Sequence, residues 1–167
     1  IDETRIYNRA LSDNEVAQLY RYTGPAAADS GLVGHWSFNG TDTTSTKAYD
    51  RSGTGNTGTL TNSPTIAEGK VGQGIAFSSA GTQVVTVPYA ASLNPTSTMS
   101  LSAWIKTGSA ANNKYILNRD ATTTSGYGFF LGAAGNPCTT TGVIGFTIGA
   151  TPNELCSAGP NLGDSLW

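Results

Sequence analysis

Carboxylate side chains are the residues of this chain that could perform acid–base chemistry, but their spacing does not build a catalytic pair. Two carboxylates that cleave a glycosidic bond must share one face, which on a strand requires an i, i+2 spacing. Asp2 and Glu3 are adjacent, so on a strand they would point to opposite faces. The other acidic candidates stand isolated in polar stretches: Glu68, Glu154 and Asp164. Because the single histidine, His35, also lies in no nucleophile motif, we expect a non-catalytic chain.

The two cysteines, Cys138 and Cys156, are the next candidates for chemistry. Neither lies in a C-x-x-C pattern and His35 is far away in sequence, so the spacing does not indicate a zinc site. In a chain with few charges and much Thr and Asn we predict an exported protein and a disulfide between them. The alternative is two unrelated buried thiols. The loop that this bond would close should contribute about 3 kcal/mol by the loop-entropy estimate.

The charge content excludes several classes of partner. Charged residues make up 12% of the chain, against about 25% in an average protein. The net charge is −2 and Lys and Arg do not cluster, so we expect no nucleic-acid partner. No apolar run approaches about 18 residues, so we expect no membrane span in this segment.

One stretch near the N-terminus has the local signals of a helix. Ser12 and Glu15 have the S-x-x-E spacing of a capping box, which predicts a helix at 12–21. The apolar residues in and just before it follow the spacing of a staple and a helical stripe: Leu11, Val16, Leu19 and Tyr20.

The rest of the chain has the pattern of short strands. Its 21 glycines and its Thr-, Ser- and Asn-rich turns separate short alternating or apolar runs. The expected strands lie at 1–8, 32–38, 75–77, 84–87, 101–106, 115–118, 127–131 and 143–148. Their spacing indicates an all-β sandwich.

Four motifs in order carry a resemblance to a known family. They are GLVGHWSF, AYDRSGTGNTGTL, GKVGQGIAFSSAGTQVVTVP and MSLSAWIKT, which together cover most of residues 31–107. This stretch resembles the opening two-thirds of a laminin G-like, concanavalin A-like jelly-roll domain, and GYGFFLG continues the match more weakly. The resemblance implies an incomplete two-sheet antiparallel jelly-roll sandwich, with one short helix near the N-terminus.

The N-terminal sequence IDETRIYNRALSDNEVAQLY resembles the closing strand and short helix of the same family. We interpret residues 1–22 as the end of a preceding repeat, 23–30 as a linker, and 31–167 as the N-terminal two-thirds of the next repeat. Circular permutation is the alternative. Neighbouring repeats of the same chain would then be its partners.

In this family the first and last strands are neighbours in one sheet, and an unpaired strand edge is unfavourable. We therefore predict that Ile1–Asn8 pairs antiparallel with Leu32–Phe38. The helix should pack over the end of that sheet through Val16, Leu19 and Tyr20.

Many members of the resembled family hold one structural calcium ion, which takes oxygen ligands. The resemblance places candidate ligands at Asp50 and Asn56, with Asp2 able to approach them if the first and last strands are neighbours. Asn39 and Asp42 are weaker candidates. The alternative is that Asp50 and Asn56 only cap turns through hydrogen bonds.

Lectin-like sandwiches bind sugars with an aromatic plate and hydrogen-bonding side chains. Tyr89 follows a proline at a strand end, Tyr127 lies between two glycines, and Trp104 faces away from the apolar row of its strand. These three are the candidate ligand-binding residues. For Trp104 the alternative is a place in the core or against a helix.

The resemblance implies a non-catalytic extracellular or cell-surface binding module within a larger multidomain bacterial protein. Its ligand would be a glycan or another surface partner. Two alternatives stay open: a structural or adhesive spacer repeat, and an accessory domain of a secreted glycosidase, sialidase or protease.

Overall fold

The computed structural model describes residues 1–21, 30–78, 82–108, 114–119, 126–132, 138, 142–149, 154–157 and 167. The chain divides into two compact units, Ile1–Trp104 and Ile105–Trp167. In the described residues both units are built from antiparallel strands, and the single α-helix belongs to the first. The expected all-β class is therefore confirmed. No helix in this part of the chain is long and apolar enough to cross a membrane.

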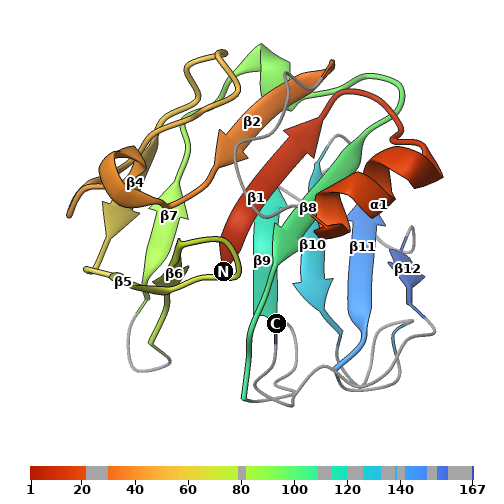
Figure 1. Cartoon of the computed structure of the whole chain (residues 1–167). Coiled ribbons are helices and arrows are strands. Elements are labelled where there is room, and N and C mark those ends of the chain that lie inside the picture. Colours follow the sequence, from red (N-terminus) through yellow and green to blue (C-terminus); the bar gives the residue numbers. More distant parts are fainter. Residues whose placement is uncertain are drawn as a thin grey trace. The chain divides into compact units, whose positions relative to one another are not determined.

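A three-stranded sheet in the first unit carries the N-terminal segment. Strand β1 (Asp2–Tyr7) lies between β2 (Leu32–Trp36) and β8 (Ser100–Trp104), and helix α1 (Asp13–Arg21) follows β1 (Figure 1). The predicted antiparallel pairing of the first strand with the 32–38 segment is confirmed. β1 is thus the central strand of its sheet, and every one of its six residues is buried.

The register of this sheet separates a polar face from an apolar face. Arg5 lies opposite His35 on β2 and Ser102 on β8. The next residue, Ile6, lies opposite Gly34 and Leu101. Because residues directly opposite each other project to the same side, Arg5, His35 and Ser102 share one face, and Ile6 and Leu101 lie on the other.

Glu3 lies in an irregularity within β1. The pairing of β1 with β8 shifts register between Asp2 and Arg5, and Glu3 has a φ of 50°. A left-handed backbone is uncommon for a residue other than glycine and costs conformational energy. The bulge keeps Glu3 and Arg5 within hydrogen-bonding distance of one another in the same strand.

Helix α1 begins as its capping box predicts. The Ser12 backbone N–H donates to Glu15 Oε2 at 2.8 Å, and the Glu15 N–H faces the Ser12 hydroxyl oxygen at 3.4 Å. The predicted packing of this helix is observed in part: the ring centroid of Tyr20 lies 5.5 Å from that of Trp104 on β8. No residue of Asp13–Arg21, all of which the structure describes, is fully buried, and Val16 is 53% exposed. The sheet residues near the helix include the charged Glu3 and Arg5 beside Trp104, so only part of the apolar stripe has an apolar partner.

The rest of the first unit contains a second three-stranded sheet and a hairpin. The sheet has the order β3 (Lys47–Ala48), β4 (Gly58–Thr61) and β7 (Val84–Thr86), and the hairpin joins β5 (Thr65–Glu68) to β6 (Gln73–Ala76). Two short 3-10 helices lie at Gly40–Asp42 and Ala91–Leu93. The buried apolar residues of this unit include Ile6, Val33, Trp36, Phe38, Leu60, Ile75 and Leu93.

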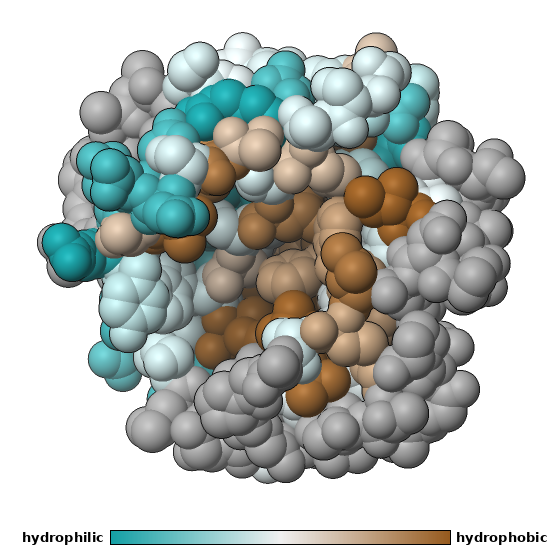
Figure 2. Space-filling model, turned by 90° about the vertical axis from the view of Figure 1, so that its right-hand side faces the viewer, coloured by the Kyte–Doolittle hydropathy of each residue, from teal (hydrophilic) through white to brown (hydrophobic). Residues whose placement is uncertain are grey.

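The second unit is a four-stranded sheet. Its order is β12 (Glu154–Cys156), β11 (Ile144–Ile148), β10 (Tyr127–Leu131) and β9 (Lys114–Arg119). Gly145 is required on β11, because a Cβ there would lie 2.4 Å from the ring of Phe130. In this unit Ile148 and Leu155 are exposed. One face of the molecule shows brown, hydrophobic areas at its surface (Figure 2).

The predicted disulfide between Cys138 and Cys156 is confirmed. The two Cα atoms lie 5.4 Å apart, and the bond joins residues separated by 18 positions. Cys138 is buried together with Phe130 and Val143. The bond therefore anchors β12, the short edge strand, to the apolar centre of this unit.

We expect the Cys138→Ser/Cys156→Ser double variant to lose about 3 kcal/mol of stability, because its unfolded chain is no longer constrained by the closed loop. Denaturant unfolding of the wild type and the variant measures the difference. Reductant should lower the stability of the wild type by a similar amount and leave the variant unchanged. An equal loss in both proteins would show that the reductant acts elsewhere.

Candidate functional site

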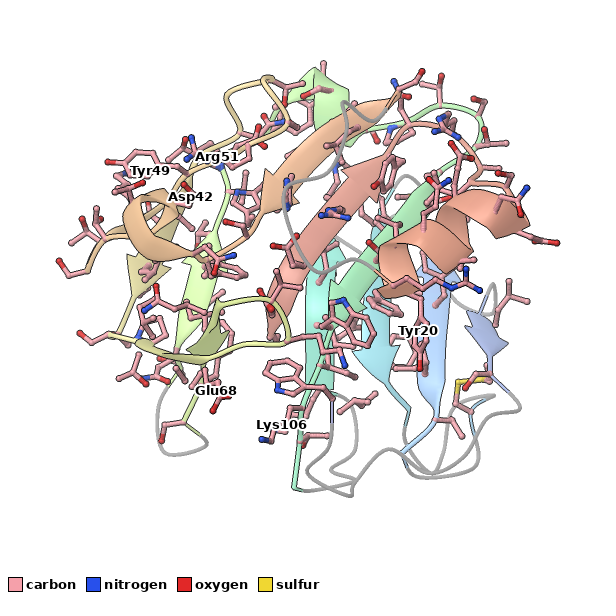
Figure 3. All side chains as sticks on the ribbon, viewed as in Figure 1. Tyr20, Asp42, Tyr49, Arg51, Glu68 and Lys106 are labelled. Atoms are coloured by element: carbon pink, nitrogen blue, oxygen red, sulfur yellow. A yellow bond between two sulfur atoms is a disulfide. The ribbon has the colours of Figure 1, made fainter. Side chains whose placement is uncertain are left out.

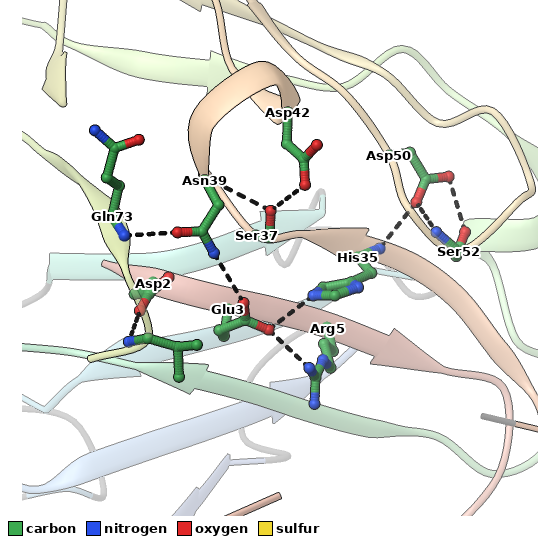
Figure 4. A network of polar contacts seen from close by, with 11 residues as sticks. Asp2, Glu3, Arg5, His35, Ser37, Asn39, Asp42, Asp50, Ser52 and Gln73 are labelled. Atoms are coloured by element: carbon green, nitrogen blue, oxygen red, sulfur yellow. Dashed lines mark hydrogen bonds and ion pairs between the residues drawn. The ribbon is translucent and has the colours of Figure 1, made fainter. Parts of the chain in front are cut away.

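A buried ion pair lies on the polar face of the β2-β1-β8 sheet. Glu3 and Arg5 side chains are 4% and 2% exposed, and Arg5 Nη2 donates to Glu3 Oε2 at 2.7 Å. His35 Nε2 lies 2.8 Å from the same oxygen, and Asn39 Nδ2 donates to Glu3 Oε1 at 3.4 Å (Figure 4). Both carboxylate oxygens of Glu3 are therefore in use, which makes Glu3 a structural acceptor.

A groove of about 400 Å³ lies between α1 and this polar face. Its floor contains the Glu3–Arg5 pair and the hydroxyl-bearing residues Ser100 and Ser102. The Ser100 hydroxyl accepts a hydrogen bond from the Leu11 N–H at 3.0 Å, which fixes the start of the helix to β8. The remaining lining is apolar or aromatic: Leu11, Val16, Leu19, Tyr20, Leu101, Ala103 and Trp104. The groove thus combines an apolar wall with a polar floor.

Two aromatic rings line this groove, and a cation lies against one of them. The rings of Tyr20 and Trp104 have centroids 5.5 Å apart and are tilted by 35°. Lys70 Nζ lies 4.9 Å from the centroid of the Trp104 ring, in the range of a cation–π contact. Tyr20 projects from α1 and is 72% exposed (Figure 3). Trp104 is half-buried. Its ring contacts Tyr20 of α1 and also lines the groove.

The structure does not bring the three predicted aromatic residues together. Trp104 lines the groove, whereas Tyr89 is 77% exposed after β7 and does not belong to the groove lining. Tyr127 lies on β10 of the second unit and is 3% exposed. Burial raises the pKa of Tyr127 to about 12, with the charge of Arg119 acting in the opposite direction. Its ring is not an open plate in this structure.

Asp50 and Asn56 are brought together, in a loop closed by hydrogen bonds to the Asp50 carboxylate. Oδ1 accepts from the N–H groups of His35 at 2.9 Å and Ser52 at 2.8 Å. Oδ2 accepts from the Asn56 N–H at 2.8 Å and from the hydroxyls of Ser52 and Thr54. Burial alone would raise the pKa of Asp50, but these donors outweigh it and the pKa is lowered. This is the turn-capping arrangement, and a calcium ion would have to displace donors from the carboxylate.

Asp2 contacts a different loop. Its Oδ2 accepts from the Val71 N–H at 2.8 Å, and its buried Oδ1 has no hydrogen-bond partner among the described residues. Desolvation by burial raises the pKa of Asp2, and the hydrogen bond from Val71 opposes this effect. Among the described residues, Asp2 and Asp50 thus have separate hydrogen-bond partners.

The two weaker calcium candidates also have protein partners. The Asn39 carbonyl oxygen accepts from the Gln73 N–H at 2.6 Å, and Asp42 accepts from the Ser37 hydroxyl and pairs with Arg51. In the described part of the chain no three His, Cys, Asp or Glu side chains are grouped to hold a metal. Calcium binding stays a prediction.

The sequence predicted Trp104 as a ligand-binding residue and Val16, Leu19 and Tyr20 as the apolar side of the helix, but not that they share a groove with Glu3 and Arg5. The opposite charges of Glu3 and Arg5 at an i, i+2 spacing predict an ion pair on one face of a strand, and this signal was available. The contact of Tyr20 with Trp104 had no local signal, because it depends on how β8 pairs with β1. Comparisons of this chain with protein-family models, curated proteins and solved structures found no match. The assignment of the groove therefore rests on the geometry of this chain alone.

We expect Glu3→Ala to lower the free energy of unfolding by about 3–5 kcal/mol, because it leaves the buried Arg5 without its carboxylate. Glu3→Gln keeps an acceptor and should lose less. The matched control is the double variant Glu3→Leu/Arg5→Met, which removes both charges and should recover most of the loss. Urea unfolding measures all three. A double variant as unstable as Glu3→Ala would contradict the assignment.

Asp2 predicts a pH dependence of stability. Its pKa is raised on folding, so between the unfolded and folded pKa values the folded chain binds more protons. Stability should therefore fall as pH rises above the ordinary aspartate value, until the folded pKa is passed. Asp2→Asn should remove this fall. The stability of the variant relative to that of the wild type should therefore be higher at pH 7 than at pH 4. Melting temperatures at both values measure the effect, and parallel curves for the two proteins would refute it.

Proposed function

We propose that the chain is a non-catalytic extracellular binding module whose ligand is a glycan, held in the groove between α1 and β8. The observation that carries the proposal is the combination of two adjacent aromatic rings, the exposed Tyr20 and the half-buried Trp104, with polar side chains in one groove. A sugar ring has apolar C–H faces and a border of hydroxyl groups. Aromatic side chains with one polar tip match the faces, and serine hydroxyls can donate to or accept from the border.

The arrangement of the groove suits binding and not turnover. Its acidic group, Glu3, already accepts from Arg5 and lies beside His35, so it has no free oxygen with which to protonate or attack a substrate. A buried, internally neutral floor holds its shape without reorganising when a ligand enters. Pre-organised sites of this kind reduce the ordering cost of binding.

Two features support the extracellular assignment and the finer fold. Disulfides persist in oxidising compartments, and this chain has one between Cys138 and Cys156. The antiparallel sheets, with β1 beside β2, suit a jelly-roll sandwich in which a closing strand lies next to an opening strand. Calcium at the 50–56 loop would be a separate structural property, on which the glycan proposal does not depend.

A glycan array probed with the whole chain tests the proposal, followed by titration of the best binder against variants. We expect Tyr20→Ala and Trp104→Ala each to weaken binding about tenfold, which corresponds to about 1.4 kcal/mol. Tyr89→Ala is the matched control, because it removes an exposed tyrosine outside the groove lining and should leave affinity unchanged.

Near-ultraviolet circular dichroism of the variants confirms that they are folded. The absence of binding to every glycan on the array would favour the alternative of a structural spacer. Binding that survives both groove substitutions would place the glycan site elsewhere.

A further inference from the structure

Residues 1–21, which we call the donor segment, occupy a slot between two strands that come from later in the chain. β1 forms one ladder with β2 and a second with β8 (Figure 1). Ile1, the residue before β1, also exchanges two main-chain hydrogen bonds with Ile75, each 2.8 Å long. Without the donor segment β2 and β8 would both lose their partner in this sheet, and each would present an open edge.

Two ion pairs lie within the donor segment, although Glu3 also pairs with His35 and Arg9 Nε also donates to the Ser30 carbonyl at 2.6 Å. Arg5 pairs with Glu3 at 2.7 Å, and Arg9 bonds to both carboxylate oxygens of Glu15. The capping box of α1, Ser12 with Glu15, is internal as well. A buried ion pair is costly to separate. Here neither pair has to be separated when the segment leaves the slot.

The contacts that cross from the donor segment to the rest of the chain comprise backbone hydrogen bonds and the packing of buried side chains such as Ile6 and Tyr7. Beyond the two ladders they include Asn8 N–H to the Gly31 carbonyl at 2.9 Å and Leu11 N–H to the Ser100 hydroxyl at 3.0 Å. Among side chains, Glu3 bonds to His35 and Asn39, and Asp2 accepts from Val71. Since no α1 residue in Asp13–Arg21 is buried, the helix adds little that would hold the segment in place.

We propose that the donor segment exchanges between copies of this chain, so that the slot between β2 and β8 receives β1 of a second copy. In this chain the segment is joined to the slot only through residues 22–29. Every contact named above is made by residues that a second copy also carries. The exchanged pair would therefore contain the same ladders and ion pairs as two closed chains, in a symmetric dimer.

The two forms differ in chain entropy and in rate. A segment tethered within its own chain is presented to the slot at an effective concentration on the order of millimolar. Exchange should therefore compete only near that protein concentration. Opening requires both ladders of a fully buried strand to break, so mixing folded chains should exchange slowly, whereas refolding together from denaturant should exchange readily.

A cross-link between copies tests the proposal. One full-length variant carries Asn8→Cys and the other carries Ser30→Cys, both at exposed positions that meet where β1 ends and β2 begins. The two are denatured without reductant, refolded together near millimolar concentration, and treated with a short thiol cross-linker. We expect a covalent heterodimer, because only exchange brings position 8 of one copy beside position 30 of the other.

The matched control replaces Ser30→Cys with Ser45→Cys, an exposed residue outside the donor segment and its slot. It should give at least about tenfold less cross-linked dimer, and dilute refolding should abolish the difference. A double variant, Asn8→Cys/Ser30→Cys, verifies the geometry by cross-linking within one chain in dilute solution. Efficient cross-linking within the chain, with equal dimer yields for the two pairs at high concentration, would overturn the proposal.

Discussion

The insertion of β1 between β2 and β8 is the constraint on which the rest of the first unit depends. It places Arg5 opposite His35 and Ser102, and thereby gathers the polar residues of three strands on one face. The bulge at Glu3, with its left-handed backbone, keeps the carboxylate beside Arg5 on that face. A strained backbone conformation persists when the surrounding contacts hold the residue in place. For Glu3 these contacts are hydrogen bonds from Arg5 and Asn39 and the contact to His35.

Asp2, which is buried, and Asp50, which is half-buried, show how local hydrogen bonding decides the pKa of a carboxylate. Asp50 and Asp2 both pay a desolvation cost, yet the pKa of Asp50 is lowered and that of Asp2 is raised. Asp50 accepts from a complete set of backbone and hydroxyl donors. Asp2 leaves one oxygen without a partner among the described residues. The hydrogen-bond donors around Asp50 thus lower its pKa more than desolvation raises it, whereas at Asp2 desolvation has the larger effect.

Local signals in the sequence predicted the elements better than the site. The capping box at Ser12 and Glu15 located α1, and alternating apolar residues located β8, β10 and β11. The short strands within 40–66 were missed because Thr, Gly and Ser leave no apolar alternation to detect. The pairing of β1 with β2 was predicted from the need to cover two edges. The groove was not, because Tyr20 meets Trp104 only through the register of β1 and β8.

The exposed stripe of α1 follows from the charge on the sheet beneath it. An amphipathic helix normally buries its apolar side chains against an apolar partner, which gains about 25 cal/mol per Å². The face beneath α1 carries the charged groups of Glu3 and Arg5, which pair at 2.7 Å, so covering them gains little hydrophobic free energy. Val16 and Tyr20 therefore stay accessible above a fixed polar floor. A ligand that has an apolar face and a polar border gains from both surfaces, whereas a purely apolar ligand gains from only one.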